Sequence, residues 1–452
     1  MKNLVDSGIY SCSRNIKTVT NEVRKMIKQT VLPFKLEKTK DLITPHAGLA
    51  LLGEFAVGLG LLDALDRELP KPGSGAGYFP REHILPLILM LHGGGRSLED
   101  VRQIKDDQGL RELLAMERVP SSDATGDWLR RCGNNDGLSG LAGVSRRLLK
   151  RGLKRDGVVG YTLDIDATGI EADKQSAKMT YKGYTGYMPI VGHLAENGLV
   201  VGDEFREGNA SPGSRNLEFI KYCRRQLPKN KHIKGFRADS ASYQADIINY
   251  CQKNKILFAI GGDLDKAVVR QIKSLGESDW RAYQNGFIAE TIHCMNKTKQ
   301  AFRLIVIRRP VQRDILEDGE AAADRYTVIV SNRSEDMEAV VRWYNQRGEC
   351  SENRIKELKI GYGMERMPCG QFAANAVFFR IGVLAYNVGR LFVLNALEPA
   401  WHRRQVRTLR WMLYETAGKV VFHGGATWLK VRRHMEALFA GVRFKSWEFA
   451  MG

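Results

Sequence analysis

Apolar residues recur at helical spacing through the first third of the chain. The stretch from Gly48 to Leu69 has them every three or four residues, and prolines and glycines then follow. A second predicted helix, in "REHILPLILMLHGGG", ends at Gly93, and Ser97 is a predicted N-cap with Asp100 three residues later. Two further helices are predicted in "DQGLRELLA" and "SSDATGDWLRRC". Residues 1–150 are therefore predicted to form a helical domain with a basic arm.

The pattern changes to that of a β-structure near Val158. The β-branched run "VVGYTLDIDATG" precedes two strands joined at Asn197 and Gly198, a strong hairpin signal. A helix in "SRNLEFIKYCRRQL", a strand ending at Asp239, another helix and the strand "ILFAIGG" follow. The order β-β-β-α-β-α-β fits few topologies, and it predicts an α/β fold with a ribonuclease-H-like core.

Residues 262–335 interrupt this core. Three strand-like runs, "FIAETIHCM", "FRLIVIRR" and "RYTVIVSN", predict a β-rich insertion there. The core is expected to comprise residues 151–261 and 336–452, with C-terminal helices. Two basic segments near the end, "WHRRQVRTLRW" and "WLKVRRHMEALF", are predicted to be amphipathic helices.

The charge balance points to a polyanionic partner. The 452 residues include 69 Lys and Arg against 51 Asp and Glu, a formal net charge of +18. Such an excess favours nucleic acid first and an anionic membrane second. The most membrane-like run contains Arg380, Asn387 and Arg390, which favours a core helix over a membrane span. Seven scattered cysteines without a C-x-x-C pair, and no visible N-terminal signal, favour the cytoplasm.

Two aspartates fall where a ribonuclease-H-like sheet gathers its carboxylates. Asp166 lies on the predicted first strand and Asp239 ends the fourth, which lies beside it. Asp164 is two residues before Asp166 and so shares its face. Carboxylates gathered in this way favour Mg²⁺, or Mn²⁺ in its place. The alternative is that Asp166 caps a turn and Asp239 caps a helix, but both falling at the site that the topology requires favours catalysis.

A third carboxylate is expected from the helix after the insertion, and here a family resemblance enters. The segments "LDIDATG", "FRADSAS" and "YNQRGECSENRIKELK" resemble the DDE transposases of bacterial insertion sequences. The similar branch has a β-strand insertion and a Tyr-Arg-Glu-Lys signature. The resemblance runs from about Gly48 to beyond Leu394 and includes "GRSLEDVRQIKDDQGLRELL" and "FFRIGVLAYNVGRL". Each Asp motif is weakly specific alone, whereas their combination in order is strong.

The resemblance implies a function and a set of residues. The activity would be cut-and-paste transposition by a homodimer on double-stranded DNA, with the N-terminal domain on the terminal inverted repeats and a freed 3′-hydroxyl attacking target DNA. The implied catalytic and metal-binding residues are Asp166, Asp239 and Glu352. The implied DNA contacts are Tyr344, Arg347 and Lys359. Two alternatives stay open: a nuclease without strand transfer, and a DNA-binding protein whose site no longer cuts.

One spacing departs from the family signature. Four residues separate Arg347 from Glu352, where the signature has three. On a regular helix the extra residue widens the arc of the four signature side chains from roughly 60° to roughly 140°. Either the chain bulges near Gly348, or Tyr344 and Arg347 serve less well. Glu349 is the rival third ligand, with poorer context.

Other motifs have simpler readings. The "HGGG" at His92 has no G-x-S-x-G partner and predicts a helix end. The loop from Gly208 to Asn216 could touch phosphate but is expected to be a connection. Trp280 could stack on a displaced base, although packing within the insertion is the expected role.

Overall fold

The structure, a computed structural model, describes residues 32, 34–73, 75–310 and 324–452. Residues 43–452 form one compact unit, and all elements from α2 onward lie in it. Strand β1 (Leu42–Thr44) precedes them. Residues 1–31 of the predicted basic arm lie outside the described part of the chain.

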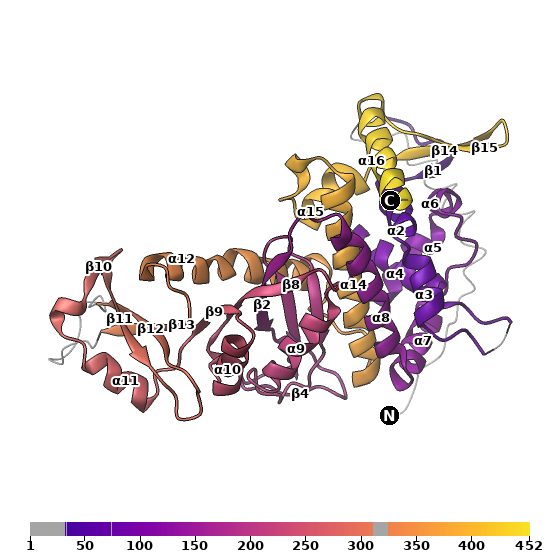
Figure 1. The fold of residues 1–452 in the computed structure, drawn as a ribbon. Coiled ribbons are helices and arrows are strands. Elements are labelled where there is room, and N and C mark those ends of the chain that lie inside the picture. Colours follow the sequence, from indigo (N-terminus) through magenta and orange to yellow (C-terminus); the bar gives the residue numbers. More distant parts are fainter. Residues whose placement is uncertain (1–31, 33, 74, 311–323) are drawn as a thin grey trace, which may run out of the picture. The chain divides into compact units, whose positions relative to one another are not determined.

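Short helices make up the first part of this unit, as the apolar spacing predicts (Figure 1). The predicted helix from Gly48 to Leu69 is in fact two helices, because Gly60 takes φ +83° between them. The helix containing His92 ends at Gly93. Ser97 is the N-cap residue of η1 (Leu98–Asp100), and its N–H donates to the Asp100 carboxylate at 2.9 Å, as the three-residue spacing predicts. The elements are α2 (Ala47–Gly58), α3 (Leu61–Glu68), α4 (Pro80–Gly93), η1 (Leu98–Asp100), α5 (Val101–Asp106), α6 (Gln108–Leu113), α7 (Ser122–Asn134) and α8 (Gly137–Lys154).

A nine-stranded mixed sheet follows, so the fold is mixed α/β. Its order is β10-β11-β12-β13-β9-β8-β2-β6-β7. Strand β2 runs antiparallel to β6 and parallel to β8, and β8 runs parallel to β9. The first part of the sheet consists of β2 (Gly160–Ala167), β6 (Ile190–Leu194), β7 (Val200–Glu204), β8 (His232–Ala238) and β9 (Leu257–Gly261), connected after β7 through α9 (Asn216–Gln226), η2 (Ser240–Ser242) and α10 (Ala245–Lys253).

The three strands predicted for residues 262–335 are present, and they extend the same sheet. Strand β13 pairs antiparallel with β9, so β10 to β13 continue the sheet beyond that edge. The bounds in this segment are α11 (Lys266–Lys273), η3 (Glu277–Asp279), β10 (Arg281–Tyr283), β11 (Gly286–His293), β12 (Phe302–Arg309) and β13 (Arg325–Ser331).

A small second sheet lies in the connection between β2 and β6. Its order is β3-β5-β4. The strands are β3 (Ile170–Glu171), β4 (Lys178–Met179) and β5 (Thr185–Tyr187). The residues between β4 and β5 form a tight turn in which Gly183 takes φ +85°. This small sheet begins with β3, four residues after Asp166, in a segment for which the sequence predicted no strand.

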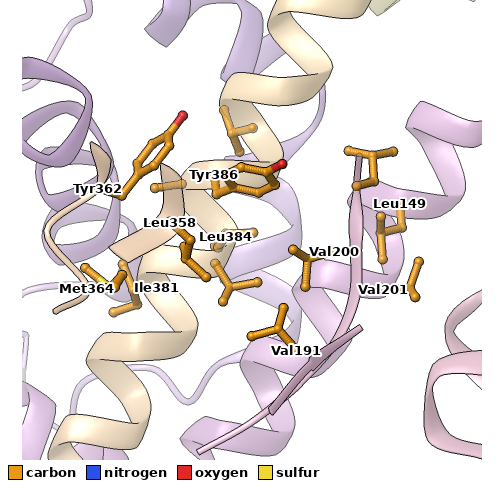
Figure 2. Packing of buried hydrophobic residues seen from close by; sticks show 14 of the residues in the cluster. Leu149, Val191, Val200, Val201, Leu358, Tyr362, Met364, Ile381, Leu384 and Tyr386 are labelled. Carbon is orange, nitrogen blue, oxygen red and sulfur yellow. The ribbon is translucent and has the colours of Figure 1, made fainter. Parts of the chain in front are cut away.

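The long apolar helix α14 (Phe372–Ala396) is the centre of the C-terminal part. It is long and apolar enough to cross a membrane, but 89% of its most apolar window is buried inside the protein. It packs on α4, α7, α8, α16 and β7. Figure 2 shows Ile381, Leu384 and Tyr386 of this helix among buried apolar side chains that include Leu358 and Val200. The expectation of a core helix is met.

The segments around α14 differ in part from the prediction. "WLKVRRHMEALF" is not one helix, because Trp428 to Lys430 lie in a β-hairpin turning at Gly424 and Gly425. The bounds are α12 (Met337–Arg347), η4 (Gly348–Glu352), α13 (Asn353–Lys356), η5 (Glu357–Gly361), η6 (Pro399–Trp401), α15 (Val406–Leu409), η7 (Arg410–Tyr414), β14 (Gly418–His423), β15 (Ala426–Lys430) and α16 (Arg433–Met451).

Candidate active site

Asp166 and Asp239 lie at corresponding ends of two neighbouring parallel strands. Asp164 of β2 and Arg237 of β8 are paired in register. Asp166 and Asp239 each come two residues later, and a step of two residues keeps a side chain on the same face of a strand. Burial is the main cause that raises the pKa of Asp166, and the negative charge of Asp239 adds to it, as expected of carboxyls brought close together. The sequence thus places both aspartates at one edge of the sheet.

Asp164 does not join this pair of carboxylates. Both of its oxygens accept hydrogen bonds from Arg237, at 2.7 and 2.8 Å, and both side chains are at most 1% exposed. Arg237 also donates to the Trp343 carbonyl of α12 at 2.6 Å. A buried ion pair of this geometry neutralises Asp164 and ties β2, β8 and α12 together. The sequence prediction that Asp164 shares a face with Asp166 holds, but its partner was missed.

The ionised form of Asp166 is disfavoured by its surroundings. Burial raises its pKa from 3.8 to about 6, and the charges of Asp239 and Glu352 act in the same direction. The Arg347 guanidinium opposes them, with one of its nitrogens 3.8 Å from an Asp166 oxygen. Burial also raises the pKa of Asp239, again against Arg347. Two carboxyls with raised pKa values at one place are typical of a functional site.

Arg347 is the cation that the acidic side chains share. It lies 3.8 Å from Glu352 as well as from Asp166, and its side chain is 13% exposed. Its Nη1 atom is buried and has no hydrogen-bond partner among the described residues. The Tyr344 ring lies beneath the guanidinium at 5.9 Å, and a Cβ atom at Gly261 of β9 would be 2.9 Å from the Tyr344 oxygen. Within the described part of the chain, the guanidinium thus keeps one nitrogen that makes no hydrogen bond.

The extra residue between Arg347 and Glu352 is absorbed by a π-helix. Residues Gly348–Glu352 form the π-helix η4 between α12 and α13. A π-helix bonds residue i to i+5 instead of i+4, so side chains five positions apart come to the same side. The 3.8 Å contact between Arg347 and Glu352 follows from this geometry. Of the two possibilities that the sequence left open, the structure has the bulged helix, and single-turn π-helices of this kind are frequent at functional sites.

Glu352 faces Arg347, and its side chain is 62% exposed. Among the residues that the structure describes, no three His, Cys, Asp or Glu side chains are gathered closely enough to hold a metal ion. The side chain of the rival, Glu349, lies outside what the structure describes. Asp166 and Asp239 offer the hard oxygen donors that suit Mg²⁺ or Mn²⁺. Their assignment as metal ligands with Glu352 stays a prediction.

The ammonium group of Lys359 makes a hydrogen bond within the protein. Its Nζ donates to the Gly169 carbonyl at 2.7 Å, in the turn that follows Asp166. Burial lowers the pKa of Lys359, and the charge of Lys182 acts in the same direction. Lys359 therefore supports the loop beside Asp166 and keeps two further N–H donors. Its predicted contact with DNA phosphate is untested.

The loop and the tryptophan singled out in the sequence have definite places. Ser211–Ser214, within the Gly208–Asn216 loop, line a groove of about 650 Å³ together with Asp239 and Asp263. Trp280 packs beside Tyr326, and the Arg308 guanidinium lies 4.3 Å from its ring centroid. The loop therefore lies beside Asp239 as well as connecting two elements. Trp280 packs within the insertion, as expected.

The site combines two buried aspartates at adjacent strand ends of a mixed sheet with an Arg and a Glu from the helical segment beside them. This arrangement is the one to compare with known protein families. The family model described as the transposase DDE domain group 1 matches residues 33–438. The chain belongs to this family of DDE transposases.

Two further comparisons complete this picture. No curated protein matches the chain. Among solved structures, the piggyBac transposase in its synaptic complex with hairpin DNA is similar, with a TM-score of 0.46 and 10% identity. The similarity covers 83% of this chain and 82% of that one.

Proposed function

We propose that the protein carries out cut-and-paste transposition of a bacterial insertion sequence. Its membership in the DDE transposase family supports this activity class. The observation that carries the proposal is the meeting of Asp166, Asp239 and Glu352 around the Arg347 guanidinium, although these residues come from three separate parts of the sequence. Such a site suits cleavage and joining at a phosphodiester.

The catalytic core in this proposal is ribonuclease-H-like. The strand order β7-β6-β2-β8-β9, with β6 antiparallel to both of its neighbours, supports it. The core would comprise residues 151–261 and 336–452, with residues 262–335 as an insertion. Residues 1–150 would form the helical domain that binds the terminal inverted repeats.

The residues of the site would divide the chemistry among them. Asp166 and Asp239 would hold Mg²⁺ or Mn²⁺. A divalent ion bound there would activate water or a 3′-hydroxyl and stabilise the leaving oxygen. The unused Nη1 of Arg347 would donate to an oxygen of the bound phosphate. Glu352 contacts the other terminal nitrogen of Arg347, and it would have to leave this contact and turn toward the two aspartates to act as the third ligand.

DNA is the proposed partner throughout. The net charge of +18 favours binding of a polyanion. Tyr344, Arg347 and Lys359 are the proposed contacts to the end of the element, and the N-terminal helices the proposed contacts to the inverted repeats. A homodimer in the cytoplasm would pair two ends and join them to target DNA.

The test uses the purified protein and duplexes that contain the two DNA segments flanking its gene, with Mg²⁺. The proposal predicts strand cleavage at the element ends and covalent joining to a target plasmid. An end that carries a 3′-dideoxynucleotide should not be joined, because it lacks the attacking hydroxyl. Cleavage without joining would instead support a nuclease, and binding without cleavage a DNA-binding protein whose site no longer cuts.

A further inference from the structure

The hairpin between β4 and β5 presents two solvent-exposed side chains on a firmly built turn. Both the N–H and the side-chain hydroxyl of Thr180 donate to the Tyr184 carbonyl at 2.8 Å, and Gly183 donates to the Thr180 carbonyl at 3.1 Å. At the tip, Tyr181 is 64% exposed and Lys182 is exposed beside it. An aromatic ring held outward in this way has a free face.

This tip stands beside the acidic site. Tyr181 lines the groove of about 650 Å³ that also contains Asp239 and Asp263. Lys182 lies 5.7 Å from the Tyr181 ring centroid, and its charge is close enough to Lys359 to lower the pKa of that group. The tip therefore lines the groove through Tyr181, and Lys182 lies within electrostatic range of the lysine that supports the turn after Asp166.

Hydrogen bonds join the walls of the groove. Gln244 donates to the carbonyls of Gly213 and Ala241, at 2.7 and 2.8 Å, and so joins two of its walls. Tyr243 also lines the groove; it is 7% exposed, and its hydroxyl oxygen has no hydrogen-bond partner in the described structure.

We propose that the tip of this hairpin is a DNA-strand contact, in which Tyr181 stacks on the base of an unpaired nucleotide in the groove beside Asp239 and Lys182 binds a neighbouring phosphate. The inference rests on the proposed function, because it takes the cleaved strand end as the source of that nucleotide. Bases stack on aromatic rings whatever their sequence. Within a duplex both faces of each internal base are covered, so the contact favours an unpaired nucleotide. The groove volume suits a single nucleotide. Asp239 and Asp263 repel the phosphate from the groove lining, so the phosphate is expected to lie near Lys182.

The contact can be tested without cleavage. Full-length protein is titrated, with Ca²⁺ in place of Mg²⁺, into a fluorescein-labelled duplex that has a short single-stranded thymidine extension and into its blunt counterpart. Tyr181→Ala is expected to weaken binding of the extended duplex about tenfold or more, and to leave the blunt duplex unchanged. Tyr181→Phe should bind like the wild type. Lys182→Ala should reduce the slope of log affinity against log salt by about one.

Phe422→Ala is the matched control, because Phe422 is 61% exposed on another hairpin; it should bind both duplexes like the wild type. The inference is overturned if Tyr181→Ala binds both duplexes like the wild type, or weakens both equally. That failure can be told from failure of the proposed function. If the wild type cleaves and joins DNA but Tyr181→Ala does not change binding, the proposed hairpin contact is wrong and the proposed function stands. If Tyr181→Ala weakens only the extended duplex but the wild type never cuts DNA, the proposed transposition is wrong and the contact stands.

Discussion

Replacing Asp166 by Asn is expected to stabilise the folded protein at neutral pH, although it removes a proposed catalytic group. Burial raises the pKa of this carboxyl from 3.8 to about 6. At 1.36 kcal/mol for each pKa unit, keeping the group ionised costs the folded state about 3 kcal/mol. Asn has a similar shape and needs no ionisation, but Arg347 loses a partner at 3.8 Å. We therefore expect a net gain of about 1–2 kcal/mol in the free energy of unfolding.

The pH dependence follows from the direction of the shift. The folded chain binds the Asp166 proton more tightly than the unfolded chain does, so the carboxyl's contribution to stability decreases as pH rises from about 4 to about 6. Arg347, Asp239 and Glu352 are the charged groups that face it. The difference between Asp166→Asn and the wild type should be small near pH 4 and complete above about pH 6.5.

Urea unfolding followed by circular dichroism at several pH values measures this difference, with Asp173→Asn at an exposed position as the control. Added Mg²⁺ should stabilise the wild type more than the variant, because the ion favours the ionised carboxyl. The reasoning is refuted if the variant is less stable than the wild type at neutral pH, or if the difference between them does not grow with pH.

Three further predictions concern the surroundings of the site. Deleting Gly348 should turn the π-helix into a regular helix that keeps Glu352 beside Arg347, so DNA cleavage should survive, whereas inserting an alanine after Gly348 should abolish it; equal loss in both variants would contradict this. Asp164→Asn should lower the free energy of unfolding by about 3–5 kcal/mol, and Asp164→Leu combined with Arg237→Leu should recover much of it in urea titrations, because the lone buried charge is then absent. Lys359→Met should lower the cleavage rate more than the affinity for DNA, with partial rescue by Lys359→Arg; an effect on affinity alone would mean that its bond to Gly169 is unimportant.

The elements around the site were predictable where local sequence determines them. Strand β8 ends directly before Asp239, where the stretch that contains Ile233 and Phe236 gives way to Ser and Ala. The hairpin of β14 and β15 was missed because its basic residues were read at helical spacing. Its own signal was present, since Gly424 and Gly425 separate two short strand-like runs.

Pairings across the fold were beyond the sequence patterns. Asp164 and Arg237 lie 73 positions apart, and only the register of β2 and β8 brings them together. The spacing anomaly before Glu352 was visible in the sequence, but spacing alone did not decide between a bulge and a weakened site. The structure has the bulge, as the hydrogen-bond pattern of the π-helix shows. A π-helix depends on the packing around it, and spacing in the sequence does not contain that information.

The central claim is that Asp166, Asp239 and Glu352 act together on DNA. Its most direct measurement is Mg²⁺-dependent cleavage of DNA that carries the element ends, by the wild type and by Asp166→Asn, Asp239→Asn and Glu352→Gln, with Glu349→Gln as the matched control. The account predicts that the first three variants bind the DNA but do not cut it, while Glu349→Gln cuts it like the wild type. Cleavage by Glu352→Gln at the wild-type rate would contradict the account.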